Sequence, residues 1–140
     1  MNKILVILIV LGLTGLSVLF AQTKSPVSNA VRVKVYYFHP NERCPIDQSI
    51  EKNSKIVMQS YFSKKIANGT ILFQVLNTDD KSNDKIVSKF DINAQALYIV
   101  KMEKGKEIRK DITRFAFDYG QSNPGKFKAG LKDEVEKALK

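Results

Sequence analysis

The chain has 140 residues, of which 44% are apolar, and it contains no low-complexity tract. This length and composition allow one domain with a packed core and exclude a disordered protein. The formal net charge is +9 at pH 7, but the basic residues are spread along the chain in short pairs, with no aromatic residues interleaved in a basic cluster. We therefore expect a solvated surface and no nucleic-acid partner.

The first 21 residues are typical of an export segment. Lys3 is followed by an uncharged stretch, residues 4–21, that is rich in Leu, Ile and Val. One prediction is a signal peptide cleaved after Ala21, which is a small residue at the last position. The alternative is an uncleaved anchor formed by residues 4–21, because 18 apolar residues lie at the lower limit for crossing a bilayer. Both alternatives predict that the rest of the chain is exported, as a periplasmic or secreted protein or one associated with the membrane.

Residues 22–30 follow as a polar linker that contains Ser25 and Pro26. Without residues 1–21, 22 basic and 14 acidic residues remain, which is a net charge of +8. Such a balance is compatible with an acidic partner or an anionic membrane surface. The domain itself is predicted over residues 31–140.

The first half of the domain predicts a strand, a helix and a second strand. Residues 31–38 alternate and then become continuously apolar, which predicts a strand entering the middle of a sheet. A helix begins at Pro45 and ends at Asn68-Gly69. Residues 70–76 are apolar on both faces, which predicts a central parallel strand covered on both sides. The helix stripe contains Ile46, Ile50, Val57 and Tyr61, widened by Ile56, Met58, Phe62 and Ile66.

The second half predicts a short helix, a hairpin and a closing helix. The short helix carries Ile86, Val87 and Phe90, after a polar connection over residues 79–84. Residues 96–100 form the next strand, residues 103–106 a hairpin turn, and residues 107–112 an edge strand whose charges discourage pairing with another sheet. Residues 115–124 are predicted to be irregular. The last helix is marked by Phe127, Leu131, Val135 and Leu139 at a spacing of four.

This order of elements predicts an α/β protein with a mixed four-stranded sheet between layers of helices, a three-layer sandwich. Its only cysteine, Cys44, falls between the first strand and the first helix. The order and the position of Cys44 resemble the thioredoxin fold over residues 31–139. The phrase from Val35 to Pro45, the segment Val75–Asp80, and the turn at Lys104-Gly-Lys before Arg109 also resemble the exported nitrophenyl compound nitroreductase subunit ArsF family.

The chain departs from the pattern of these families at two positions. In the ArsF family Arg-Cys-Pro is usually followed by a second Cys, whereas this chain has Asp47 at that position, so its C-x-x-C motif is degenerate. Near Ala94-Gln95-Ala96, where a thioredoxin carries a cis-proline facing the active thiol, this chain has no proline. No G-x-G-x-x-G follows a strand, so we expect neither a flavin nor a nicotinamide site, and no other cofactor.

The candidate site residues are Cys44, Pro45 and Asp47. Unpaired backbone N–H groups at a helix start favour a thiolate, and Arg43 and Lys52 could add to this, whereas Glu42 and Asp47 would oppose it. Dithiol exchange needs a second thiol, so the chain is not expected to be an intramolecular dithiol-disulfide oxidoreductase.

Three functions stay open for this site. The first is an accessory or monothiol redox role through Cys44, with a protein partner. The second is a non-enzymatic binding module, or a subunit of a membrane-associated assembly, in which Cys44 is inert. The third and weakest is a soft-metal site formed by His39, Cys44 and Asp47, which are ligand types without a metal-binding spacing.

Two further segments have simpler interpretations. Asp79 and Asp80 follow the second strand, where a turn and helix-start role is expected rather than paired catalytic carboxylates. The aromatic residues of the segment Phe115–Tyr119 either cap the core beneath the last helix or present a surface to a partner.

Overall fold

The computed structural model describes residues 30–140. The predicted signal peptide or anchor and all of the predicted linker except Ala30 lie outside these residues. The elements are β1 (Val33–His39), α1 (Pro45–Ala67), β2 (Ile71–Asn77), a 3-10 turn (Lys81–Asn83), α2 (Asp84–Phe90), β3 (Ala96–Glu103), β4 (Lys106–Asp111), α3 (Thr113–Tyr119) and α4 (Pro124–Leu139).

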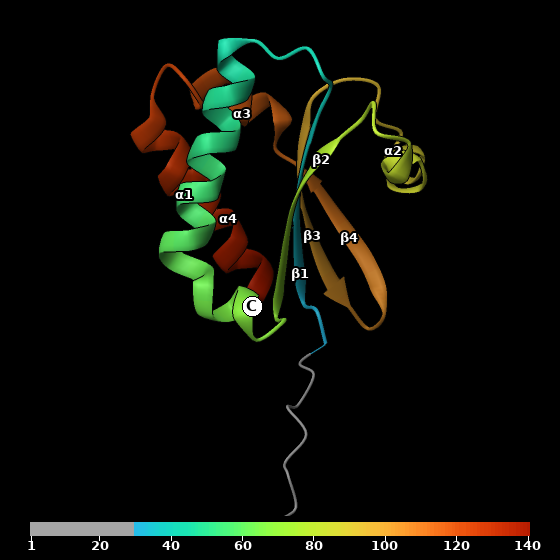
Figure 1. The fold of residues 1–140 in the computed structure, drawn as a ribbon. Coiled ribbons are helices and arrows are strands. Elements are labelled where there is room, and N and C mark those ends of the chain that lie inside the picture. The colour runs from blue at the N-terminus through green and yellow to red at the C-terminus, as the bar shows by residue number, and fades with distance from the viewer. Residues whose placement is uncertain (1–29) are drawn as a thin grey trace, which may run out of the picture.

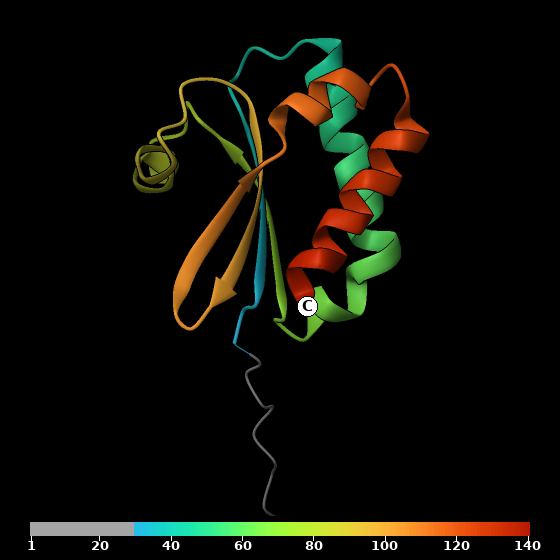
Figure 2. The same ribbon diagram turned by 180° about the vertical axis from the view of Figure 1, so that it is seen from behind.

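The four strands form one mixed sheet in the order β2-β1-β3-β4. β1 pairs with β2 in parallel and with β3 antiparallel, and β4 is antiparallel to β3. Helices α1, α3 and α4 cover one face of the sheet, and the short helix α2 lies against the other (Figure 1, Figure 2). The predicted mixed sheet and the three layers are confirmed, and their topology is that of the thioredoxin fold.

The core consists of two clusters, one on each face of the sheet. The larger cluster joins the sheet to α1, α3 and α4, and its largest fully buried members include Tyr37, Ile50 and Phe127. The smaller cluster lies under α2, where the rings of Tyr36, Phe38, Phe90 and Tyr98 contact one another with centroids 5.2 to 6.4 Å apart. Because both faces are covered, burial of apolar surface can stabilise the sheet without any disulfide.

The prediction of a central second strand is wrong, because β2 is an edge strand that pairs with β1 alone. Its two faces are apolar because helices lie on both sides of the sheet. Phe73 and Val75 pack against the larger cluster, while Leu72 and Leu76 belong to the smaller one. A strand that is apolar on both faces is therefore covered by helices on both sides of the sheet, but the pattern does not indicate how many strands it pairs with.

The prediction of an irregular segment at residues 115–124 is wrong for residues 115–119, because α3 spans Thr113–Tyr119, whereas residues 120–123 form a turn before α4. A helix places residues four apart on one side, and Phe115 and Tyr119 have ring centroids 5.2 Å apart. Phe115, Phe117 and Tyr119 all pack against the larger cluster. This segment therefore caps the core, as one of the two interpretations expected.

The apolar stripe of α1 differs from the prediction at two residues. Tyr61 and Ile56 are 58% and 37% exposed, and the inner face instead contains the polar residues Asn53 and Ser54. Asn53 is held there because its Nδ2 donates a 3.0 Å hydrogen bond to the carbonyl oxygen of Gly120, at the end of α3. Periodicity alone assigns polar residues to the outer face and cannot detect such a partner.

Glu107 of β4 forms the centre of an ion-pair network on the α2 side of the sheet. Its carboxylate accepts hydrogen bonds from the ammonium groups of Lys89 at 2.7 Å and Lys34 at 2.9 Å, and Arg109 lies 3.3 Å away. Hydrogen bonds from Lys89 and Lys34 lower the pKa of Glu107 from 4.5 to about 2. The guanidinium of Arg109 also lies 4.0 Å above the centre of the Phe90 ring.

We expect Glu107→Gln to lower the free energy of unfolding by about 1 kcal/mol at neutral pH. Because the pKa of Glu107 is lower in the folded state than in the unfolded chain, its contribution is complete above 4.5 and is lost as the pH falls toward about 2. Urea denaturation of both proteins across this range measures the effect. A difference that stays constant down to pH 2 would contradict the assignment.

Candidate functional site

Cys44 lies at the start of α1, as the sequence predicts. It is the N-cap residue, with extended backbone angles of φ −81° and ψ 165°, and Pro45 occupies the first turn of the helix. Its carbonyl oxygen accepts the first helical hydrogen bond from the backbone N–H of Gln48 at 3.2 Å. The residue is exposed and free. The thiol is therefore accessible at the end of the sheet where β1 passes into α1 (Figure 1).

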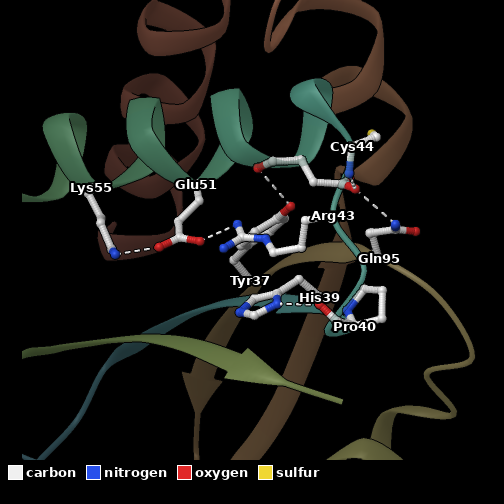
Figure 3. Close-up of polar contacts among 9 residues, drawn as sticks. Tyr37, His39, Pro40, Arg43, Cys44, Glu51, Lys55 and Gln95 are labelled. Atoms are coloured by element: carbon white, nitrogen blue, oxygen red, sulfur yellow. Dashed lines mark hydrogen bonds and ion pairs between the residues drawn. The ribbon is translucent and has the colours of Figure 1, made fainter. Parts of the chain in front are cut away.

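Asp47 is fully buried, and its carboxylate caps the backbone of the helix. Oδ2 accepts a 3.0 Å hydrogen bond from the backbone N–H of Cys44 and another of 3.0 Å from Nε2 of Gln95. In Figure 3 the sulfur of Cys44 points away from the contact of this carboxylate with Gln95. Asp47 thus occupies the position of a resolving cysteine but interacts with the backbone of Cys44.

Gln95 is a site residue that the sequence analysis did not single out. It lies in the segment where the resemblance leads one to expect a cis-proline, and all peptide bonds of residues 30–140 are trans. The two departures from the thioredoxin pattern, Asp47 and Gln95, are therefore in direct contact although they lie 48 positions apart in the sequence. One signal in the sequence could have indicated this contact. In the thioredoxin fold, the positions of Asp47 and Gln95 both lie next to the active thiol.

Tyr37 of β1 contacts the backbone of Asp47. The hydroxyl of Tyr37 donates a 3.0 Å hydrogen bond to the backbone carbonyl oxygen of Asp47. Burial raises the pKa of Tyr37 well above 10, and the nearby Asp47 carboxylate raises it further, so the phenol stays protonated. The phenol therefore acts as a fixed donor that holds the first turn of α1 against β1.

Arg43 forms an ion pair with Glu51, which also pairs with Lys55 (Figure 3). Burial opposes the ionisation of Glu51, but hydrogen bonds from Lys55 and Arg43 outweigh it and lower the pKa of this carboxyl. The charge of Arg43, which the sequence analysis considered as support for a thiolate, is thus largely engaged along α1. A groove of about 500 Å³ follows this face and is lined by Arg43, Gln48, Glu51, Lys52, Lys55, Ile56 and Gln59.

His39 serves the loop. Its Nδ1 donates a 2.8 Å hydrogen bond to the carbonyl oxygen of Pro40, and its half-buried ring lies 6.0 Å from that of Tyr37. Within residues 30–140 no three His, Cys, Asp or Glu side chains come together in a way that could hold a metal ion. The trio of His39, Cys44 and Asp47 is therefore not assembled as a ligand set.

Asp79 and Asp80 stabilise turns at the end of β2, as expected. Asp79 accepts a 2.6 Å hydrogen bond from the backbone N–H of Asn41, and Asp80 caps the 3-10 turn through the backbone N–H of Ser82 at 2.9 Å. Asn77 also contacts Asn41 at 2.7 Å through its side-chain amide. These contacts tie the loop before Cys44 to the neighbouring strand, so the loop is positioned by β2 as well as β1.

The site can perform thiol chemistry with an external partner only. Cys44 is the single cysteine of the chain, and the neighbouring position is filled by a buried carboxylate. A disulfide formed at Cys44 must therefore be broken by a thiol from another molecule.

No family model matches the chain, and comparison with curated proteins found no match. The chain is similar in structure to a malarial protein, with a TM-score of 0.40 and 16% identity over 62% of this chain and 93% of that one. It is also similar to an uncharacterized thioredoxin-like protein from Clostridium perfringens, with a TM-score of 0.49 and 13% identity over 81% of this chain and 76% of that one.

Of the helices between residues 30 and 140, none is both long and apolar enough to span a membrane. Sheet order, strand directions and helix layers together assign the chain to the thioredoxin-like fold, with Cys44 at the junction of its first strand and first helix.

Proposed function

We propose that this protein is an exported thioredoxin-like protein with an accessory or monothiol redox role through Cys44. The observation that carries this proposal is the exposed position of Cys44 at the N-cap of α1, beside the fully buried Asp47. The sulfur of Cys44 is accessible to another molecule. The position where a second, resolving thiol would lie carries a carboxylate instead.

The proposed reaction is thiol–disulfide exchange in two steps. The Cys44 thiolate attacks one sulfur of a partner disulfide, a mixed disulfide forms, and the other partner sulfur leaves as a thiolate. A second external thiolate then attacks the mixed disulfide, which releases Cys44 as a thiolate and leaves the partner with the new disulfide. Protons are exchanged with water, and the protein is neither oxidised nor reduced over the cycle.

The proposal is tested by mass spectrometry of the native protein. With glutathione disulfide, we expect a single adduct at Cys44, which excess glutathione removes, and no intramolecular disulfide. Cys44→Ser is the matched control and should form no adduct. If the thiol reacts with iodoacetamide or the disulfide only after unfolding, the redox role is excluded.

A binding module is the second candidate, and the contact between Gln95 and Asp47 favours it. This hydrogen bond occupies the region where the resemblance implies a resolving thiol and a cis-proline. In such a module the fold serves as a binding surface, for instance in a subunit of a membrane-associated assembly, and Cys44→Ser leaves the function in the host intact. A loss of that function with Cys44→Ser, in a protein that still folds, would exclude this candidate.

Export is part of the proposal and has its own test. The uncharged stretch of residues 4–21 and the resemblance to the exported ArsF family support it. N-terminal sequencing of the protein from fractionated cells distinguishes the alternatives. Cleavage predicts a chain that begins at Gln22, whereas an anchor predicts an intact chain in the membrane fraction.

A further inference from the structure

Basic side chains that are scattered in the sequence gather at one end of the domain. Arg32 precedes β1, Lys64 and Lys65 lie in the last turn of α1, Lys101 lies near the end of β3, and Lys104 and Lys106 flank the turn into β4. We call this set the basic end. It lies opposite the loop that carries Cys44, and both views of the ribbon agree on this arrangement (Figure 1, Figure 2).

Strand pairing brings these residues together. Val33 pairs with Ile71 of β2 and with Lys101 of β3. The backbone N–H of Arg32 donates to the carbonyl oxygen of Thr70 at 2.9 Å, and its own carbonyl oxygen accepts from Met102 at 2.7 Å. Ala30, Arg32, Lys65 and Thr70 also line one surface hollow of about 380 Å³. The end of α1 and the β3–β4 hairpin therefore flank the point where the chain enters the domain.

Most charges of the basic end have no acidic partner among the described residues. Lys101 pairs with Glu103 at 3.2 Å. Between residues 30 and 140, Lys64, Lys65, Lys104 and Lys106 have no carboxylate within ion-pair distance, and all four are exposed. Because salt screens charges beyond about 8 Å at physiological ionic strength, such a cluster acts locally on whatever lies against it.

At the far end of the domain, the segment after β2 contains both acidic and basic residues. After β2, the basic residues Lys81 and Lys85 alternate with Asp79, Asp80 and Asp84. The segment after β2 therefore carries charges of both signs, unlike Lys64, Lys65, Lys104 and Lys106 of the basic end. The basic end also receives the chain at Ala30, after the uncharged stretch of residues 4–21.

We propose that the basic end is a docking surface for an anionic phospholipid bilayer. A lysine close to such a surface contributes about a fivefold increase in partitioning, and several exposed lysines act together. β1 has seven residues between the basic end and the loop of Cys44, which at about 3.3 Å per residue separates them by more than 20 Å. A domain docked in this way presents Cys44 to the aqueous side, away from the lipid. The proposal does not depend on the chemistry of Cys44.

The test uses the full chain with vesicles of phosphatidylcholine alone or mixed with phosphatidylglycerol. Lysine acetylation is followed residue by residue by mass spectrometry. In the anionic vesicles we expect Lys64, Lys65, Lys104 and Lys106 to be acetylated at least about fivefold more slowly, whereas Lys81 and Lys85 change less than about twofold because they lie beyond the screening length. High salt should remove the protection.

Two charge-matched variants sharpen the test. Lys65→Glu with Lys106→Glu should abolish the protection of Lys64 and Lys104, whereas Lys81→Glu with Lys85→Glu, which changes the net charge equally, should leave it intact. Circular dichroism verifies that both variants fold. Equal behaviour of the two variants, or protection that is the same in both kinds of vesicle, overturns the proposal. Protection by polyglutamate without protection by anionic vesicles also overturns it and reassigns the surface to an acidic protein.

Discussion

Replacing Gly120 with alanine is expected to lower the free energy of unfolding by about 2 kcal/mol, or more if the neighbours cannot shift. Gly120 ends α3 in a helical conformation, with φ −56° and ψ −37°, so its backbone does not require glycine. Glycine is required at this position because there is no space for a Cβ atom. An added Cβ would lie 2.5 Å from Cγ1 of the fully buried Ile50 and 2.6 Å from the carbonyl oxygen of Ala116.

Gly125→Ala is the matched control for this prediction. Gly125 lies in the first turn of α4, where an added Cβ meets only the side-chain oxygen of Asn123 at 3.6 Å, an ordinary contact. Alanine there should be neutral or stabilise the helix by up to about 1 kcal/mol. Urea denaturation measures both variants. If Gly120→Ala is as stable as Gly125→Ala, α3 does not pack against α1 as closely as described.

A double-mutant cycle identifies the contact that matters. Ile50→Ala removes the nearest side-chain atom, so adding Gly120→Ala in that background should cost less than in the wild type. The remaining cost reports the approach to the carbonyl oxygen of Ala116, which no change of rotamer can relieve. Additive effects would show that Ile50 is not the obstacle.

Replacing Asp47 with cysteine is expected to convert a protein that depends on an external resolving thiol into a dithiol oxidoreductase. Side chains three residues apart at a helix start are neighbours, and Asp47 already reaches back to the backbone of Cys44 at 3.0 Å. The introduced thiol can attack a mixed disulfide at Cys44, which supplies the resolving step that the natural chain lacks. Insulin reduction by dithiothreitol should rise at least about tenfold above the uncatalysed rate.

The substitution also has a structural cost. It removes the carboxylate that accepts hydrogen bonds from Cys44 and Gln95, which should destabilise the protein by about 1.5 to 3 kcal/mol. Asp47→Ser is the matched control, since it removes the same carboxylate and provides no thiol. It should be destabilised similarly and remain inactive. If Asp47→Cys folds but keeps two free thiols after oxidation, the two side chains do not meet as the helix start implies.

Much of the fold could be predicted because its signals are local. The alternation of residues 31–38, the helical period after Pro45 and the charged hairpin at residues 103–112 each match an observed element. The predictions for the second strand and for residues 115–119 were wrong because the same local pattern can arise from different tertiary arrangements. β2 is apolar on both faces because helices cover it, although it lies at an edge, and α3 is too short and too aromatic to show a helical period clearly.

The candidate site was predictable only in part. The sequence placed Cys44 at a helix start and showed that no second thiol is available. It did not show where the carboxylate of Asp47 points, because that depends on Gln95, a residue 48 positions away. A side chain joined to a distant partner leaves no periodic trace in the sequence.

The sequence by itself therefore determined the order of elements, the single thiol at the first strand-to-helix junction and the absence of an intramolecular resolving step. Only the tertiary structure decided the burial of Asp47, its contact with Gln95 and the gathering of Arg32, Lys65 and Lys106 at one end. The physical reason is that backbone periodicity is set by neighbouring residues, whereas burial and local electric field depend on which distant segments the sheet brings together.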